Sequence, residues 1–250
     1  MRTFSVLLLW AACAWGGIRL DNSNSSGSIA AGTLTGSITS FAVSSSSSIL
    51  VVVVPFYSTP SKQVSTVSWM GSTTGWTKAL RSNDGSHNVS VEIWYLLTPT
   101  PGNGTVSVTI NGNDGSNPWG FGVYSLIGTT GAPYPAGGSY HTVGSGAGTI
   151  SDSITVATSG DWMIDGFAGN SPTTPSTGVS QSNVMTPWNT SGSGNGWGMA
   201  SLYQSAPAGP QAMSWTYGSG STALSHAMVA IGQAQAKHPG GYSILMEDEQ

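Results

Sequence analysis

The sequence predicts an all-β protein, a two-sheet antiparallel sandwich of the jelly-roll type. The first observation is a series of about eleven or twelve short apolar segments, several of which alternate with a two-residue period. Clusters of Gly, Ser, Asn and Pro separate these segments, and none shows the period of an amphipathic helix. The second observation is that only 6% of the 250 residues are charged. Long surface helices need Lys, Glu and Arg on their solvent face, so this composition disfavours them.

The same composition limits the possible partners. The chain carries 6 basic and 10 acidic residues, for a formal net charge of −4. Nucleic-acid binding requires clustered Lys and Arg, so no nucleic-acid partner is predicted. The hydrophobic fraction of 38% is enough for a core. The single cysteine, Cys13, excludes an intramolecular disulfide and a cysteine-based metal site.

Three segments indicate strands most clearly. Ile49–Val54 is a continuous aliphatic run, predicted to be a strand buried on both faces and to end at Pro55. Val89–Leu97 and Gly104–Ile110 alternate in side-chain character along their length. The other predicted strands are Ile38–Val43, Val64–Met70, Trp76–Leu80, Phe121–Ile127, Thr149–Ala157, Trp162–Ala168, Gly196–Tyr203, Ala212–Tyr217 and Ser225–Ile231.

These strands are expected to form one domain. Residues 18–235 are predicted to be a single β-sandwich domain, because sandwiches of this length are common as single units. No exact internal repeat is found in it, and residues 236–250 form a polar tail. The residues expected to face inward are Leu50, Val52, Val91, Ile93, Val106, Val108, Val123, Ile164 and Val229.

Residues 1–17 form an apolar N-terminal segment with two open interpretations. One positive charge precedes the apolar run Phe4–Trp15, and Ala12-Cys13-Ala14 has the small-x-small pattern of a signal-peptide cleavage site. The alternative is a retained assembly arm, in which Phe4–Trp15 is buried against another chain. The run is too short to span a bilayer, so no membrane span is predicted.

Several strand patterns together resemble those of a known group of proteins. The chain is similar to Gly/Ser/Thr-rich β-sandwich proteins of bacterial secretomes and tailed-bacteriophage virions. The resemblance covers residues 18–233 and implies a fold and a location at a virion surface or outside the cell, with no catalytic residues to transfer. The segments that carry it are Ile49–Val54, Val91–Leu96, Gly104–Ile110, Gly160–Asp165, Met213–Thr216 and His226–Gly232.

Two strand-borne acids are the only catalytic candidates, Glu92 and Asp165. Jelly-roll glycosidases place two carboxylates on one concave sheet, about 5–5.5 Å apart in retaining enzymes and farther apart in inverting ones. If the strands of Glu92 and Asp165 were neighbours, these residues would form such a pair. The competing interpretation is that each acid is satisfied by hydrogen bonds inside the fold. We expect the second, and therefore assign no catalytic residue.

Four tryptophans are candidate ligand-binding residues, because flat sugar rings stack on exposed indole faces. Gly-rich or Pro-flanked contexts favour exposure of Trp76, Trp119, Trp188 and Trp197. The alternative is that these rings cover the ends of the sheets. Four further tryptophans, each inside a predicted strand, are assigned to the core: Trp69, Trp94, Trp162 and Trp215.

No metal or other cofactor is predicted. The four histidines, His87, His141, His226 and His238, are scattered without metal-ligand spacing. Three aspartates in Asn- and Gly-rich loops allow either calcium binding or turn capping: Asp84, Asp114 and Asp152. The chain contains neither a nucleotide-binding Gly-x-x-x-x-Gly-Lys loop nor a Gly-x-Ser-x-Gly elbow.

These observations favour a non-enzymatic structural protein of a virion, either a bacteriophage capsid decoration protein or a fibre-like surface subunit. Its expected partners are copies of itself and other structural proteins, with surface glycans as a further candidate. The alternative is a secreted carbohydrate-binding module that uses the loop tryptophans. A glycoside hydrolase is the third hypothesis.

Overall fold

The computed structural model describes residues 17–57, 63–83, 89–112, 118–134, 148–171, 173–190, 196–218 and 223–234. These residues form fifteen strands and no helix, so the predicted all-β class is confirmed. Consequently, no helix in the described ranges has the length and apolar character needed to cross a membrane. The run Phe4–Trp15 and the tail 236–250 lie outside the described residues.

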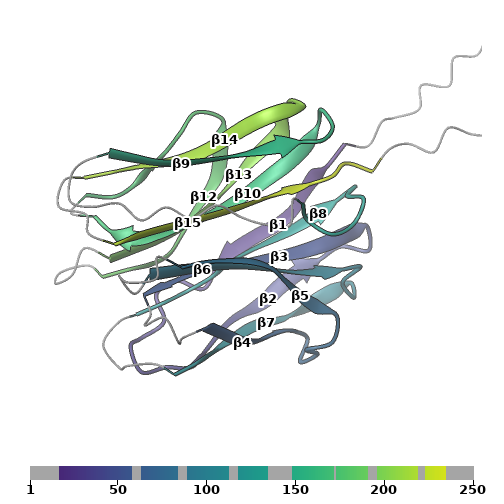
Figure 1. Cartoon of the computed structure of the whole chain (residues 1–250). Helices are drawn as coiled ribbons and strands as arrows, with labels where there is room; N and C mark the ends of the chain where they lie inside the picture. The colour runs from purple at the N-terminus through teal and green to yellow at the C-terminus, as the bar shows by residue number, and fades with distance from the viewer. Residues whose placement is uncertain are drawn as a thin grey trace, which may run out of the picture.

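The strands form four antiparallel sheets, which we name by their position in the stack of layers in Figure 1. The first outer sheet contains β2 (Thr35–Val43), β7 (Gly102–Asn111) and β4 (Gln63–Trp69). The first inner sheet contains β1 (Arg19–Ser25), β8 (Gly122–Ile127), β3 (Ser47–Tyr57), β6 (Val89–Leu97) and β5 (Trp76–Asn83). The second inner sheet contains β12 (Gln181–Asn189), β13 (Gly196–Ala206), β10 (Asp161–Asn170) and β15 (Leu224–Ile231). The second outer sheet contains β11 (Ser176–Thr177), β14 (Gly209–Tyr217) and β9 (Gly148–Val156).

Apolar side chains fill each space between adjacent layers. Phe41 and Val108 of the first outer sheet pack with Val52 of β3. Across the middle of the stack, Ile93 of β6 packs in one cluster with Ile164 of β10. Between the second inner and second outer sheets, the rings of Phe167 and Trp215 stack with their centroids 5.8 Å apart. The two inner sheets are therefore covered on both faces.

This layering explains the aliphatic run in β3. Residues 50, 52 and 54 face the first outer sheet, and residues 49, 51 and 53 face the second inner sheet. A strand that is covered on both sides needs apolar residues at every position, as predicted for Ile49–Val54. All nine residues predicted to face inward are buried.

β3 does not end at Pro55, as the sequence had predicted, but continues to Tyr57. Pro55 lies opposite Val91 on β6, whereas pairing with β8 ends at Val53. The Pro55 carbonyl accepts a hydrogen bond from the indole of Trp188 and so points to the side that β8 has left. The N and O atoms of one strand residue point to the same side, so the missing N–H of proline costs no ladder hydrogen bond here.

The described chain repeats one strand connectivity. The first half has the orders β8-β3-β6-β5 and β2-β7-β4, and the second half has β15-β10-β13-β12 and β9-β14-β11. Adding seven to each strand number in the first half gives the strand orders of the second half. β1 extends the first inner sheet beside β8 and stands outside this repeat. The chain thus repeats its topology although its sequence contains no exact internal repeat.

The number of sheets differs from the prediction, since the described residues form four sheets and not two. Side-chain alternation indicates which face of a strand is covered, but it does not show that a second pair of sheets covers the other face. Three strands were also missed: β1, β11 and β12. β1 is polar except for Leu20, β11 has two residues, and β12 contains Pro187.

Candidate functional site

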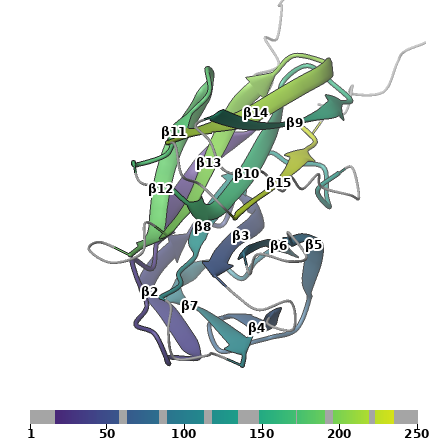
Figure 2. The ribbon, with the colours of Figure 1, turned by 60° about the vertical axis from the view of Figure 1, so that its left-hand side comes forward.

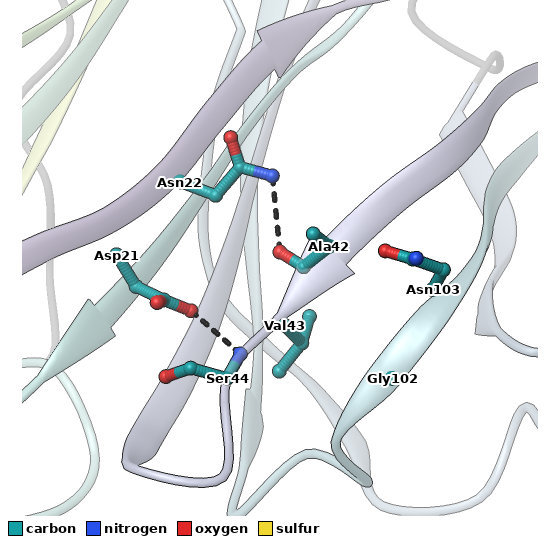
Figure 3. A pocket seen from close by; sticks show the side chains of 7 residues that line it. All are labelled: Asp21, Asn22, Ala42, Val43, Ser44, Gly102 and Asn103. Atoms are coloured by element: carbon teal, nitrogen blue, oxygen red, sulfur yellow. Dashed lines mark hydrogen bonds between the residues drawn. The ribbon is translucent and has the colours of Figure 1, made fainter.

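A pocket of about 440 Å³ opens at the edge where β1 passes the end of β2 and the start of β7 (Figure 3). The floor is formed by the end of β2 and the residue after it. The walls come from β1 on one side and β7 on the other. The lining residues are Asp21, Asn22, Ala42, Val43, Ser44, Gly102 and Asn103.

Asp21 is directed to this pocket by an irregularity in β1. Leu20 pairs with Leu126 and Asn22 with Ser125, so Asp21 is the extra residue of a β-bulge. A bulge of this kind bends its strand and changes the direction of a side chain. Asp21 Oδ2 accepts hydrogen bonds from Ser44 N at 3.0 Å and Ser125 Oγ at 2.7 Å.

These contacts favour the charged carboxylate. Partial burial on its own raises the pKa of Asp21, but the hydrogen bonds from Ser44 and Ser125 outweigh this effect and lower the pKa below its usual value. Among the described residues, no Lys or Arg forms an ion pair with this carboxylate. Within the ranges that the structure describes, the negative charge of the pocket is therefore not paired with a cation.

The other polar groups of the pocket are neutral. Asn22 Nδ2 donates to Ala42 O at 3.0 Å, which fixes the amide against the floor. Figure 3 shows the Asn103 amide extending from β7 toward β2. The hydroxyl of Ser44 is shielded from solvent and lies beside the Asp21 carboxylate, whose pKa it helps to lower.

A second polar cluster is buried between the second inner and second outer sheets. Asp165 is fully buried on β10, where Ser201 Oγ donates to Oδ1 at 2.6 Å and Trp215 Nε1 donates to Oδ2 at 2.8 Å. His226 Nε2 lies 2.9 Å from the same Oδ2, and Gln181 Nε2 donates to it at 3.2 Å. The Asp165 side chain is thus surrounded by partners and faces no open cleft.

His226 connects this cluster to the second outer sheet. Its Nδ1 lies 2.8 Å from Asp152 Oδ2 on β9, so one fully buried imidazole bridges two carboxylates. Burial on its own lowers the pKa of His226, but the hydrogen bonds and charges of Asp152 and Asp165 raise it to about 9. His226 is therefore an imidazolium at neutral pH. Asp152 lies in a strand and pairs with His226, unlike the calcium-binding or turn-capping loop residue expected from the sequence.

Glu92 is fully buried at a separate position, between the first inner and first outer sheets. Its carboxylate accepts hydrogen bonds from Trp94 Nε1 at 2.9 Å and Val64 N at 3.1 Å. Lys78 Nζ and Arg81 Nε lie 3.6 Å and 3.7 Å from its oxygens. Four donors or cations therefore hold Glu92 within the layers.

Glu92 and Asp165 do not meet. Glu92 contacts β4 of the first outer sheet, whereas Asp165 contacts β14 of the second outer sheet. The apolar cluster between the two inner sheets separates them, and their side chains point in opposite directions. They therefore lack the shared cleft that a pair of glycosidase carboxylates requires.

A third buried acid, Asp161, is also fully partnered. Gln233 N donates to it at 2.8 Å and Thr158 N at 3.1 Å, and the Tyr134 hydroxyl donates a further hydrogen bond. Burial and the hydrogen bond to Asp161 raise the pKa of Tyr134 to about 12. These contacts fix the segments that flank β10 and β15.

Two of the four tryptophans predicted to bind a ligand are buried. Trp119 donates its indole N–H to Thr33 O at 2.8 Å, and Trp188 donates to Pro55 O, so neither presents a ring face to solvent. Trp188 lies within β12, and its ring covers Gly196 and Gly198 of the neighbouring strand β13. Trp119 forms isolated β-bridges with Ile29 and Phe56. Trp76 and Trp197 are half-buried and keep part of their surface exposed. Of the tryptophans assigned to the core, Trp94 is half-buried, and the others, Trp69, Trp162 and Trp215, are buried.

The remaining polar candidates give no further site. No group of three or more His, Cys, Asp or Glu side chains within the described ranges is arranged to hold a metal ion. His87, His141, His238, Asp84 and Asp114 lie outside the described residues.

Few sequence patterns indicated the groups that the structure brings together. Asp21 lies in a polar segment without alternation, so it was not linked to a strand or a pocket. His226 had one available signal, because it interrupts the apolar run of β15 and a histidine there needs buried partners.

Comparisons of the chain with protein-family models, with curated proteins and with solved structures find no match.

Proposed function

We propose that the chain is a non-enzymatic structural subunit of a virion surface, of the capsid-decoration or fibre-like kind. In this proposal each outer sheet and its inner neighbour act as one sandwich, and the subunit assembles through its two outermost faces. The observation that carries the proposal is the character of those faces, which lie at opposite ends of the stack (Figure 2).

The face of the first outer sheet presents rows of hydroxyl groups. Thr109 on the middle strand β7 lies between Thr35 and Thr66, and the Thr35 and Thr109 hydroxyls are 2.9 Å apart. Two residues farther along the strands, in the next row of outward-facing side chains, Ser107 lies beside Ser37, and their hydroxyls are 2.8 Å apart. None of the three strands of this sheet contains a charged residue.

The face of the second outer sheet repeats this pattern. Thr216 on the middle strand β14 lies between Thr149 and Ser176, and the hydroxyls of Thr149 and Thr216 are 3.1 Å apart. The only charged residue in the strands of this sheet is Asp152, whose carboxylate is paired with His226. Both outermost faces are therefore neutral sheets with hydroxyls that partly satisfy one another.

Such faces suit contacts between subunits. Packing them against another neutral surface requires no charge to be desolvated, which removes the largest cost of burying polar surface. A molecule with two adhesive faces on opposite sides can form repeated contacts, as a shell or a fibre requires. The buried acids support the same interpretation, because Glu92, Asp161 and Asp165 are held within the layers.

The assembly part of the proposal is tested by placing charges on each face. Sedimentation velocity and negative-stain electron microscopy of the full chain should show multimers. The double variants Ser37→Lys/Ser107→Lys and Thr149→Lys/Thr216→Lys should each reduce the size of the multimers, and the combined variant should be monomeric. Thr77→Lys on β5 is the matched control, because it adds a charge outside both faces. A stable assembly has a dissociation constant well below about 100 μM. A wild-type chain that stays monomeric at that concentration would therefore contradict the proposal.

The virion part is tested on particles from the native source. Peptide mass spectrometry of density-purified virions should detect this chain in amounts comparable with other surface proteins. Its absence from particles, together with its presence in the culture medium, would favour the secreted alternative.

One observation keeps the carbohydrate-binding alternative under test. Trp76 and Trp197 retain exposed surface on which a sugar ring can stack. In that case a glycan array should give binding that Trp76→Ala or Trp197→Ala removes.

A further inference from the structure

The pocket beside Asp21 differs in composition from the two outermost faces. Those faces are uncharged, whereas this pocket is concave and contains a carboxylate without an ionic partner in the described part of the chain. The Ser44 hydroxyl is shielded from solvent beside the same carboxylate.

We propose that this pocket binds a neutral sugar ring through two adjacent hydroxyl groups, one held by Asp21 and the other by Asn103. This inference goes beyond the structural role proposed above and does not depend on it.

The available hydrogen-bonding groups match a pair of sugar hydroxyls. Asp21 Oδ2 is occupied by Ser44 N and Ser125 Oγ, and these two contacts orient Oδ1 as a further acceptor. The Asn103 amide on the opposite wall offers both a donor and an acceptor. A hydroxyl group is likewise a donor and an acceptor, so a vicinal pair can donate to the carboxylate while accepting from the amide.

The floor of the pocket suits the carbon skeleton of a ring. Ala42 contributes a short, exposed apolar side chain between the polar walls, and Val43 beside it belongs to the buried apolar cluster beneath the first outer sheet. The carbonyl of Ala42 is already held by Asn22 Nδ2, so the floor offers few competing polar groups. A ring C–H face can therefore lie on the floor while its hydroxyls reach the walls.

Size and charge both disfavour a metal ion as the occupant. Calcium takes six to eight oxygen ligands, usually with several carboxylates. The lining residues include one carboxylate, and one of its oxygens already accepts two hydrogen bonds. A volume of about 440 Å³ also lies within the range of small-molecule sites and greatly exceeds that of an ion.

The test uses the full chain and defined probes. Ligand-observed NMR and calorimetry would be run with methyl α-glucopyranoside, methyl α-mannopyranoside and methyl β-galactopyranoside, and with calcium chloride alone. At least one glycoside should bind saturably at millimolar concentration. Asp21→Asn and Asn103→Ala should each weaken its binding by about tenfold, the scale expected for a lost ligand hydrogen bond.

Two variants protect the test against misfolding and against binding elsewhere. Asn103 is exposed, so Asn103→Ala leaves the fold intact even if Asp21→Asn disturbs the bulge. Ser37→Ala, on the outer face, is the matched control and should bind as the wild type does.

Three outcomes would overturn the inference. One is that no glycoside binds even at a concentration of about 50 mM, which exceeds the dissociation constant of a weak but specific sugar complex. Another is Asp21-dependent binding of calcium without binding of sugar. The third is sugar binding that survives both pocket variants and is lost in Trp76→Ala or Trp197→Ala. Because none of these measurements reports on assembly, failure here is distinguishable from failure of the proposed structural role.

Discussion

His226 illustrates at the scale of a residue how this nearly uncharged chain uses its few charges. The imidazolium lies between Asp152 and Asp165. The charge of Asp165 also acts on Tyr124 of β8, whose phenol is buried. Burial, followed by the charge of Asp165, raises the pKa of Tyr124 well above its usual value, so the phenol stays neutral. The cluster therefore holds one cation and two carboxylates, with its charge set by the proton on His226.

This arrangement predicts that stability depends on pH. The pKa of His226 rises from 6.5 to about 9 on folding. A raised pKa stabilises the folded state fully below pH 6.5, and this contribution is lost as pH increases toward 9. The loss amounts to roughly 3 kcal/mol at most, since each pKa unit corresponds to about 1.4 kcal/mol.

The measurement is urea unfolding at pH values between about 6 and 9.5, a window that spans both pKa values. The free energy of unfolding should decrease over this range. His226→Gln, which keeps hydrogen-bonding capacity without a titrating proton, should flatten the dependence. An NMR titration of the wild type in which His226 loses its proton near pH 6.5 would contradict the prediction.

At the scale of elements, the contact between the two inner sheets depends on a position without a side chain. A Cβ atom on Gly166 of β10 would lie 2.5 Å from Val53 Cγ1 on β3 and 2.6 Å from Val91 Cγ1 on β6. Both contacts are far inside van der Waals separation. The β-branched partners are themselves packed, so neither can move aside freely.

We therefore expect Gly166→Ala to destabilise the protein by about 1–3 kcal/mol, the usual cost of overpacking a core. Gly17→Ala is the control, because a Cβ atom there would have its nearest neighbour at 3.8 Å. Chemical denaturation of both variants measures the difference. Equal stability of the two variants would show that the inner sheets tolerate a wider separation.

The elements also show how far sequence patterns determine this fold. β6 was predicted with its observed bounds because its apolar period is clean and both of its ends are marked. β1 and β12 lie at the edges of the inner sheets, where one side of the backbone lacks a partner and the side chains need not alternate. The pocket was not predictable from local sequence either. It depends on the bulge at Asp21, and that bulge forms by pairing with β8, a strand about a hundred residues away in the chain.

At the scale of the whole molecule, the repeated topology raises the question of whether the halves fold separately. Each half has its own outer and inner sheets, and each has apolar side chains between them. The twenty residues of the central cluster, however, come from both halves. In an isolated half, its share of that cluster would be exposed as a broad apolar sheet face.

Burial of this shared cluster predicts that residues 17–234 unfold as one cooperative unit, as expected for a single domain. Each large side chain in the cluster contributes about 1.5–3 kcal/mol on burial, so the central interface stabilises both halves by more than a typical domain's total stability. Unfolding one half would remove that contribution from the other. Differential scanning calorimetry of the full chain should therefore give one transition, with calorimetric and van't Hoff enthalpies that agree. Residues 148–234 expressed alone should aggregate or expose apolar surface to a fluorescent dye. Two separate calorimetric transitions of the full chain would show that the repeated units are independent. A soluble and folded isolated half would show the same.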